Sequence, residues 1–154
     1  MANILVTGGS GTIGSFICRK LHALGHNAVV FSRDLGSQLE KCPGRLSAVG
    51  DVERRSDIDC AIKRFAIQGI IHTAANKHVN LCEKFPSIAV RANILGTLNV
   101  LEAVRDFDLD KVVVVSTDKA CNHEQTYGMS KYLCEQMVGE FVNFHDVIGN
   151  SVRF

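Results

Sequence analysis

The stretch Asn3–Gly14, N-I-L-V-T-G-G-S-G-T-I-G, joins an apolar run to a glycine-rich turn and the start of an amphipathic segment. The apolar run predicts a buried strand at Asn3–Thr7, and the pattern that follows predicts a helix at Thr12–Leu24, which Gly25 ends. A glycine-rich turn lets the main chain approach a pyrophosphate closely, at the N-terminus of the helix. Strand, glycine turn and helix in this order therefore predict a dinucleotide-binding site.

The spacing of the glycines supports this prediction. Gly9, Gly11 and Gly14 fit G-x-G-x-x-G, and Gly8 with the last two fits G-x-x-G-x-x-G. No Lys-Ser/Thr pair follows the last glycine, which excludes a nucleoside-triphosphate P-loop. The alternative is a glycine-rich turn that binds nothing. The residues expected to hold a cofactor here are Gly8, Ser10, Gly11, Thr12, Ile13 and Gly14.

The rest of the chain repeats the alternation of strand and helix. Further strands are predicted at Asn27–Phe31, Leu46–Gly50, Gly69–Thr73, Lys111–Ser116 and Ile148–Phe154. Further helices are predicted at Arg54–Phe65, Pro86–Arg105 and Tyr127–Phe144. This alternation predicts an α/β fold, a doubly wound parallel sheet of the Rossmann type. We expect residues 1–154 to form a dinucleotide-binding domain that is truncated after its sixth strand, with no substrate domain in this chain.

The composition limits the classes of protein that the chain can belong to. A net charge of +1 gives no footprint for nucleic acid, and no apolar run approaches the roughly 20 residues of a membrane span. No signal peptide is visible, and the six cysteines show no C-x-x-C spacing, so we expect a reducing cytoplasm. Cys18, His22 and His26 lie four residues apart without a carboxylate, and we expect no metal site there.

The end of the second predicted strand bears on the choice of cofactor. An acid at this position typically holds the ribose of NAD, but here the sequence reads F-S-R-D, with Arg33 before Asp34. A guanidinium suits a 2′-phosphate, so NADP is favoured and NAD stays possible; the alternative for Arg33 is a solvated loop cation. Asp51, with Val52 beside it, ends the third strand and could contact an adenine amino group or cap the next helix.

Tyr127 and Lys131 lie four residues apart on a predicted helix and so share one face. A nearby ammonium lowers the pKa of a tyrosine, which would make Tyr127 a base toward a substrate hydroxyl during hydride transfer. We expect the apolar stripe of this helix to run through Leu133, Met137, Phe141 and Phe144, with Lys131 at its edge.

Three stretches carry a family resemblance: F-S-R-D (31–34), A-A-N-K-H-V (74–79) with R-A-N-I-L-G-T (91–97), and S-T-D-K-A to Y-G-M-S-K (116–131). Over its whole length the chain resembles the amino-terminal half of the extended short-chain dehydrogenase/reductase superfamily. Within that group it looks most like the inverting UDP-N-acetylglucosamine 4,6-dehydratases and related polysaccharide-biosynthesis proteins.

The resemblance implies a reaction in which C4 of the sugar is oxidised, water is lost across C5 and C6, and the hydride returns to C6. Tyr127 and Lys131 would serve the oxidation. Lys119 would take the C5 proton, which requires burial to lower its pKa, and Asp118 would help to protonate the leaving hydroxyl. The alternative for Asp118 and Lys119 is a surface ion pair or a turn cap.

The resemblance also implies a cofactor pocket that includes Ala74 and Asn93, a UDP-N-acetylglucosamine pocket that includes Lys77, and a homo-oligomer formed through the helices near 86–105 and 127–144. Two other functions stay open. A nucleotide-sugar 4-epimerase shares the Tyr/Lys pair but returns the hydride to C4. A non-catalytic NADP-binding fragment or scaffold would bind cofactor without turnover.

Overall fold

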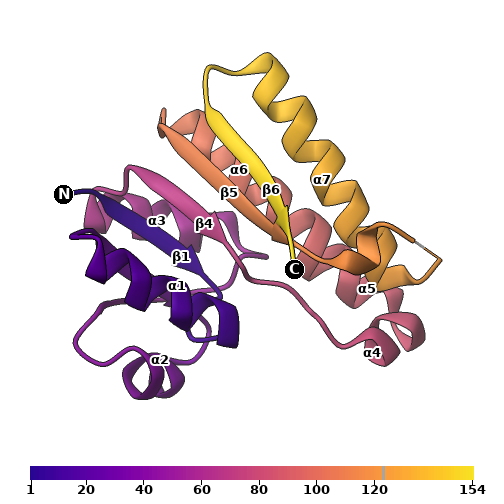
Figure 1. Ribbon diagram of the computed structural model, residues 1–154, viewed down its shortest axis with the longest axis horizontal. Coiled ribbons are helices and arrows are strands. Elements are labelled where there is room, and N and C mark those ends of the chain that lie inside the picture. Colours follow the sequence, from indigo (N-terminus) through magenta and orange to yellow (C-terminus); the bar gives the residue numbers. More distant parts are fainter. Residues whose placement is uncertain (123) are drawn as a thin grey trace.

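The computed structural model describes residues 1–122 and 124–154, which contain one six-stranded sheet whose paired strands are all parallel (Figure 1). The strands are β1 (Asn3–Thr7), β2 (Asn27–Ser32), β3 (Leu46–Val49), β4 (Gly69–His72), β5 (Lys111–Ser116) and β6 (Ile148–Arg153). Their order across the sheet is β3-β2-β1-β4-β5-β6, which confirms the predicted doubly wound arrangement. The order reverses between β1 and β4, where folds of this type have a crevice at the carboxyl ends of the strands.

Helices cover both faces of the sheet (Figure 1). On one face lie α1 (Thr12–Ala23) and α2 (Leu35–Lys41). On the other lie α3 (Arg55–Phe65), α6 (Gly96–Asp106) and α7 (Thr126–Phe144). This division follows from right-handed crossovers that run in opposite directions from β1.

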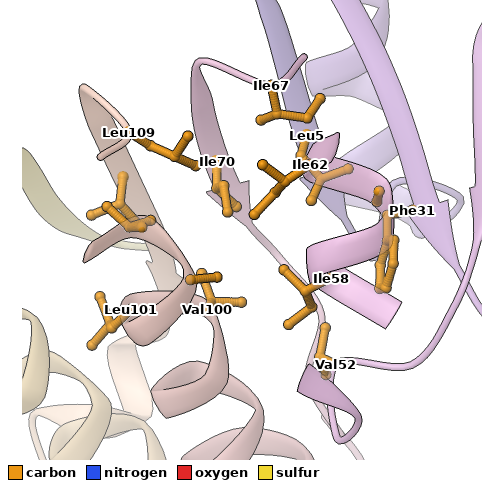
Figure 2. Close-up of a cluster of buried hydrophobic side chains, with 14 of the residues drawn as sticks. Leu5, Phe31, Val52, Ile58, Ile62, Ile67, Ile70, Val100, Leu101 and Leu109 are labelled. Carbon is orange, nitrogen blue, oxygen red and sulfur yellow. The ribbon is translucent and has the colours of Figure 1, made fainter. Parts of the chain in front are cut away.

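Successive residues of the central strands enter different cores. Leu5 and Val29 belong to the larger cluster, on the α3 and α6 side, whereas Val6 and Val30 belong to the smaller cluster under α1. Figure 2 shows the larger cluster, in which side chains from the sheet meet Ile58 and others from the helices. Because side chains alternate between the faces of a strand, a sheet covered on both faces requires apolar residues without alternation.

The predicted helix at 86–105 is divided in the structure. It begins as α5 (Pro86–Ala89), with proline in the first turn, widens into a π-helical segment η1 (Val90–Leu95), and continues as α6. Three short helices were not predicted: α2, α4 (Val79–Lys84) and the 3-10 turn η2 (Asp118–Ala120). Each has seven residues or fewer, too few for an apolar period to be visible.

The apolar stripe predicted for α7 is right at Met137 and Phe141, which pack against the larger core cluster, and wrong at Leu133 and Phe144. Leu133 and Phe144 are 45% and 78% exposed, and the buried face runs instead through Lys131, Cys134 and Val138. The sequence pattern misleads because α7 has apolar residues on two faces, and only one of these packs on the sheet. The consequence for the site is that Lys131 lies on the buried face itself, with 2% of its surface exposed.

Candidate cofactor and active site

A cleft of about 450 Å³ opens at the carboxyl ends of β1 to β4, at the point where the strand order reverses. Its lining includes eleven residues predicted from the sequence for the cofactor or the substrate: Gly8, Ser10, Gly11, Thr12, Ile13, Gly14, Arg33, Asp51, Val52, Ala74 and Lys77. The other predicted site residues, Asn93, Asp118, Lys119, Tyr127 and Lys131, lie outside this lining. The structure therefore brings eleven of the predicted binding residues together in one cleft, whereas Asn93 and the four predicted catalytic residues are not part of its lining.

The glycine turn forms one wall of the cleft with its main chain. Gly8 has a φ of 65°, a conformation that residues with a side chain rarely adopt. A Cβ on Gly14 would collide with the Gly8 carbonyl oxygen, so the start of α1 can approach the turn only without a side chain there. Helix α1 has no side-chain cap at its N-terminus. Its first main-chain N–H groups thus lie at the cleft without a side-chain acceptor, which is the arrangement that binds a phosphate.

Arg33 and Asp34, the two charged residues directly after β2, have different surroundings. The Arg33 side chain is 78% exposed, and its guanidinium lies 3.9 Å from the Asp51 carboxylate across the cleft. The Asp34 carboxylate accepts a hydrogen bond from the Ser37 main-chain N–H at 3.1 Å and caps α2. Asp34, the one acid in F-S-R-D, therefore already has a hydrogen-bond partner within the chain, whereas the Arg33 side chain is largely exposed to solvent.

Asp51 does not cap the next helix, so this alternative is wrong. Helix α3 has Arg54 at its N-cap position, without a side-chain cap bond. The Asp51 carboxylate instead accepts from the Glu53 main-chain N–H at 3.1 Å, in a turn that precedes the helix. The turn holds the carboxylate in the lining of the cleft, where the sequence predicted an adenine contact.

Tyr127 and Lys131 differ in their surroundings. Burial raises the pKa of Tyr127, while the neighbouring Thr117 hydroxyl and Lys119 ammonium act in the opposite direction. The sequence predicted a net lowering of this pKa; in the structure the net shift is upward, and the ammonium among its main causes is that of Lys119. Burial lowers the pKa of Lys131, because desolvation disfavours its charged form.

Asp118 and Lys119 lie in the η2 turn directly after β5. The Lys119 ammonium is 3.4 Å from the Asp118 carboxylate, and both side chains are largely exposed. The Thr117 hydroxyl caps this turn and donates to Asp118 at 3.0 Å. These contacts with Thr117 and Lys119 lower the pKa of Asp118. The surface ion pair considered from the sequence thus exists, and both of its charges act on the pKa of Tyr127.

Asn93 is fully buried in the π-helical segment and fixes the wall of the cleft. Its side chain accepts from the Asn76 main-chain N–H at 2.7 Å and donates to the Asn76 carbonyl at 3.2 Å. It also donates to the Ser130 hydroxyl at 2.9 Å, which links the segment to α7 between Tyr127 and Lys131. Asn93 therefore connects the segment that carries Lys77 with the helix that carries the predicted catalytic pair.

Two contributors to the site were missed from the sequence. Ser32 lines the cleft beside Arg33, and its hydroxyl lies 3.0 Å from that of Ser10. Thr117 contacts both Asp118 and the Tyr127 phenol. Both belong to the stretches that carry the family resemblance, F-S-R-D and S-T-D-K, so their positions were visible although their contacts were not.

Other classes of site find little support in the part of the chain that the structure describes. No group of three His, Cys, Asp or Glu side chains among these residues could hold a metal ion. All six cysteines are free thiols. None of the described helices is both long and apolar enough to cross a membrane.

Fold and cleft together define the class, a doubly wound α/β domain of the Rossmann type. The chain belongs to the polysaccharide biosynthesis protein family, which it matches over residues 4–154. It is 37% identical over 150 residues to the capsular polysaccharide biosynthesis protein CapD of Staphylococcus aureus, covering 88% of this chain and 24% of that protein. It is 32% identical over 156 residues to the inverting UDP-N-acetylglucosamine 4,6-dehydratase of Campylobacter jejuni, covering 97% of this chain and 45% of that protein. The family predicted from the three stretches is confirmed.

Among solved structures, the UDP-glucose 4-epimerase of Thermus thermophilus in complex with NAD superimposes with a TM-score of 0.89 at 27% identity. The superposition covers 98% of this chain and 54% of that one. The chain thus spans about half the length of this structure, and less than half of each of the two relatives above.

Proposed function

We propose that the chain is the cofactor-binding part of an NADP-dependent nucleotide-sugar dehydratase of the UDP-N-acetylglucosamine 4,6-dehydratase type, acting in polysaccharide biosynthesis. The observation that carries the proposal is the η2 turn, which holds an acid and a lysine and packs with the Lys119 carbonyl oxygen against Gly128, the residue after Tyr127. Oxidation of a hydroxyl needs one base, whereas elimination of water needs a further base and an acid. The 32% identity to the Campylobacter dehydratase supports the same reaction.

The residues of the cleft fit a nicotinamide dinucleotide. The bare main chain at Gly8 and Gly14 offers the close approach that a pyrophosphate needs, and Asp51 suits the adenine end. Arg33 favours NADP over NAD, because its exposed side chain at the cleft could pair with a 2′-phosphate, while Asp34 is engaged as the cap of α2. When bound, the nicotinamide would take a hydride from the sugar and return it.

The residues around Tyr127 would move the protons. Tyr127 would accept the proton of the C4 hydroxyl; its raised pKa makes the neighbouring Thr117 and Lys119 necessary to stabilise the phenolate. Lys119 would lose the proton of its ammonium after the oxidation and then take the C5 proton, which requires the substrate to bury its 51% exposed side chain. Asp118 has a lowered pKa and is ionised at neutral pH, so it could act as an acid only after substrate binding raises that pKa.

The same proposal includes a nucleotide-sugar substrate and a homo-oligomer. Lys77 lines the cleft on the segment held by Asn93 and would contact the phosphates or the sugar of the nucleotide. Helix α7 exposes Met129 and Leu133, and η1 exposes Leu95, so apolar surface remains on both regions predicted to pair in an oligomer.

The experiment replaces Lys119 by Met and follows the mass of the product. The purified chain is incubated with NADP and UDP-N-acetylglucosamine, and a product lighter by one water molecule would support the proposal. Lys119→Met should slow its formation by about a hundredfold or more, because the base for the C5 proton is lost. Lys20→Met, an exposed lysine on α1, is the matched control. Dehydration at the parent rate in Lys119→Met would contradict the role of Lys119.

An epimerase is the second candidate, favoured by the structural likeness to the Thermus epimerase. The same incubation separates the two reactions, since epimerisation leaves the mass of the sugar nucleotide unchanged. NADP binding without any turnover would instead support a non-catalytic NADP-binding chain. In such a chain Tyr127→Phe would leave NADP binding unchanged.

A further inference from the structure

Gln38 is the buried residue of helix α2, with none of its surface exposed. Its Nε2 donates to the carbonyl oxygens of Ser32 and Ala48, both at 2.9 Å. Because carbonyl oxygens only accept, the end of the amide that faces them is the NH₂ group. Gln38 therefore ties the carboxyl end of β2 to β3, directly behind the cleft.

The same nitrogen lies 3.0 Å from the Ser32 hydroxyl oxygen; with two hydrogens for three acceptors, it shares one hydrogen between this oxygen and a carbonyl oxygen. The Ser10 hydroxyl donates to the Ser32 hydroxyl oxygen at 3.0 Å. The hydroxyl hydrogen of Ser32 then has only a long contact, 3.5 Å from Ser32 Oγ to the Asp34 carbonyl oxygen. The serine pair thus keeps a hydroxyl donor at the cleft, next to Arg33.

Packing alone does not account for a glutamine at this position. The Gln38 Oε1 atom is buried and has no hydrogen-bond partner among the described residues. Burying an unpartnered amide oxygen costs free energy, which an apolar side chain of the same size would avoid. The contacts that distinguish Gln38 from an apolar residue are therefore those of its NH₂ group.

We propose that Gln38 is a positioning residue that sets the preference for NADP over NAD. It holds the main chain and hydroxyl of Ser32 so that this hydroxyl and the Arg33 guanidinium are available to one phosphate group. A 2′-phosphate accepts hydrogen bonds and carries charge, whereas NAD has a neutral hydroxyl there. The inference rests on the proposed function, in which the chain binds NADP.

Calorimetric titration of the full chain with NADP and, separately, with NAD tests this inference. Gln38→Met keeps the shape of the side chain and removes its donors. We expect NADP binding to weaken by about tenfold, the loss of a hydrogen bond to a charged group, while NAD binding changes by less than about twofold. A purely structural role would weaken both equally. Leu39→Gln, the opposite exchange at an exposed position of the same helix, should leave both affinities unchanged.

Ser32→Ala keeps the inference testable if Gln38→Met does not fold, since it leaves the bonds from Gln38 to the two carbonyls in place. We expect a similar loss of the NADP preference; where Gln38→Met folds, the double variant should show no additional loss, because both residues act through one hydroxyl. If the parent prefers NADP and both variants keep that preference, the role of Gln38 is overturned and the proposed function stands. If the parent shows no preference for NADP, the proposed cofactor is wrong, and the inference falls with it.

Discussion

At the scale of single residues, His72 is the buried group whose ionisation bears most on stability. It ends β4 with no exposed surface, and its ring nitrogens lie 2.7 Å from the Thr7 hydroxyl and 3.1 Å from the Thr97 hydroxyl. Burial, together with the nearby Lys131 ammonium, lowers the pKa of His72 from 6.5 to about 3. The imidazole is therefore neutral in the folded chain throughout the range in which an unfolded histidine takes up a proton.

We predict that the free energy of unfolding falls as the pH is lowered through this range. Above about pH 6.5 both states hold His72 neutral; between 6.5 and about 3 only the unfolded chain protonates it, which favours unfolding. The loss approaches about 1.4 kcal/mol per pH unit, or about 2 kcal/mol between pH 7 and pH 5. Urea unfolding of the parent and of His72→Gln at the two pH values measures this difference.

The variant should be less stable at pH 7, but it should lose about 2 kcal/mol less than the parent on acidification. Thr97→Val is the control, because it removes a contact of the ring without removing the titrating group. Its stability should fall while its pH dependence stays that of the parent. Equal pH dependence in the parent and His72→Gln would show that His72 is protonated in the folded chain.

For single residues, the sequence predicted positions in the site better than it predicted contacts between side chains. The positions of Arg33 and Asp51 followed from one rule, that a dinucleotide binds at the carboxyl ends of the strands, and both line the cleft. The groups that act on Tyr127 did not follow, because spacing on one helix favours Lys131, whereas Thr117 and Lys119, from the segment after β5, act on the pKa of the phenol. Contacts between side chains from different elements depend on packing, which a local pattern does not contain.

At the scale of elements, β1 to β5 were predictable because each has an apolar run between turn residues, whereas β6 is largely polar and has no buried residue, so it followed from the alternation of strand and helix. Helix α2 was missed since only Gln38 of its seven residues is buried, although Asp34 followed by Ser37 is a capping pattern. The π-helical segment has no sequence signal of its own. Such segments often occur at functional sites, and here the segment carries Asn93.

We predict that Asn93→Ala lowers the free energy of unfolding by about 2 kcal/mol, because Asn76 and Ser130 lose their buried partner. Amide hydrogen exchange should rise at Asn76 and the residues after it, since this segment is held to η1 by the same side chain. Asn80→Ala, an exposed asparagine on α4, should change stability by less than about 0.5 kcal/mol. Unchanged exchange at Asn76 would contradict the role given to Asn93.

At the scale of the whole molecule, the cleft and the predicted catalytic residues lie at the same edge of the sheet but in different environments. The nucleotide residues line a formed cleft, whereas Asp118 and Lys119 are largely exposed. The chain covers only 45% of the Campylobacter dehydratase and 54% of the Thermus epimerase structure. Cofactor binding is therefore the part of the proposed function that these residues can show most directly.

The most direct measurement is a calorimetric titration of the chain with NADP and with NAD, repeated on Arg33→Ala. We expect the parent to bind NADP at least about tenfold more tightly than NAD, because the guanidinium contacts only the 2′-phosphate. Arg33→Ala should lose this preference, and Arg64→Ala, which removes an exposed arginine on α3 away from the cleft, should keep it. Failure of the parent to bind either dinucleotide, or equal affinity for both, would contradict an NADP site in this cleft.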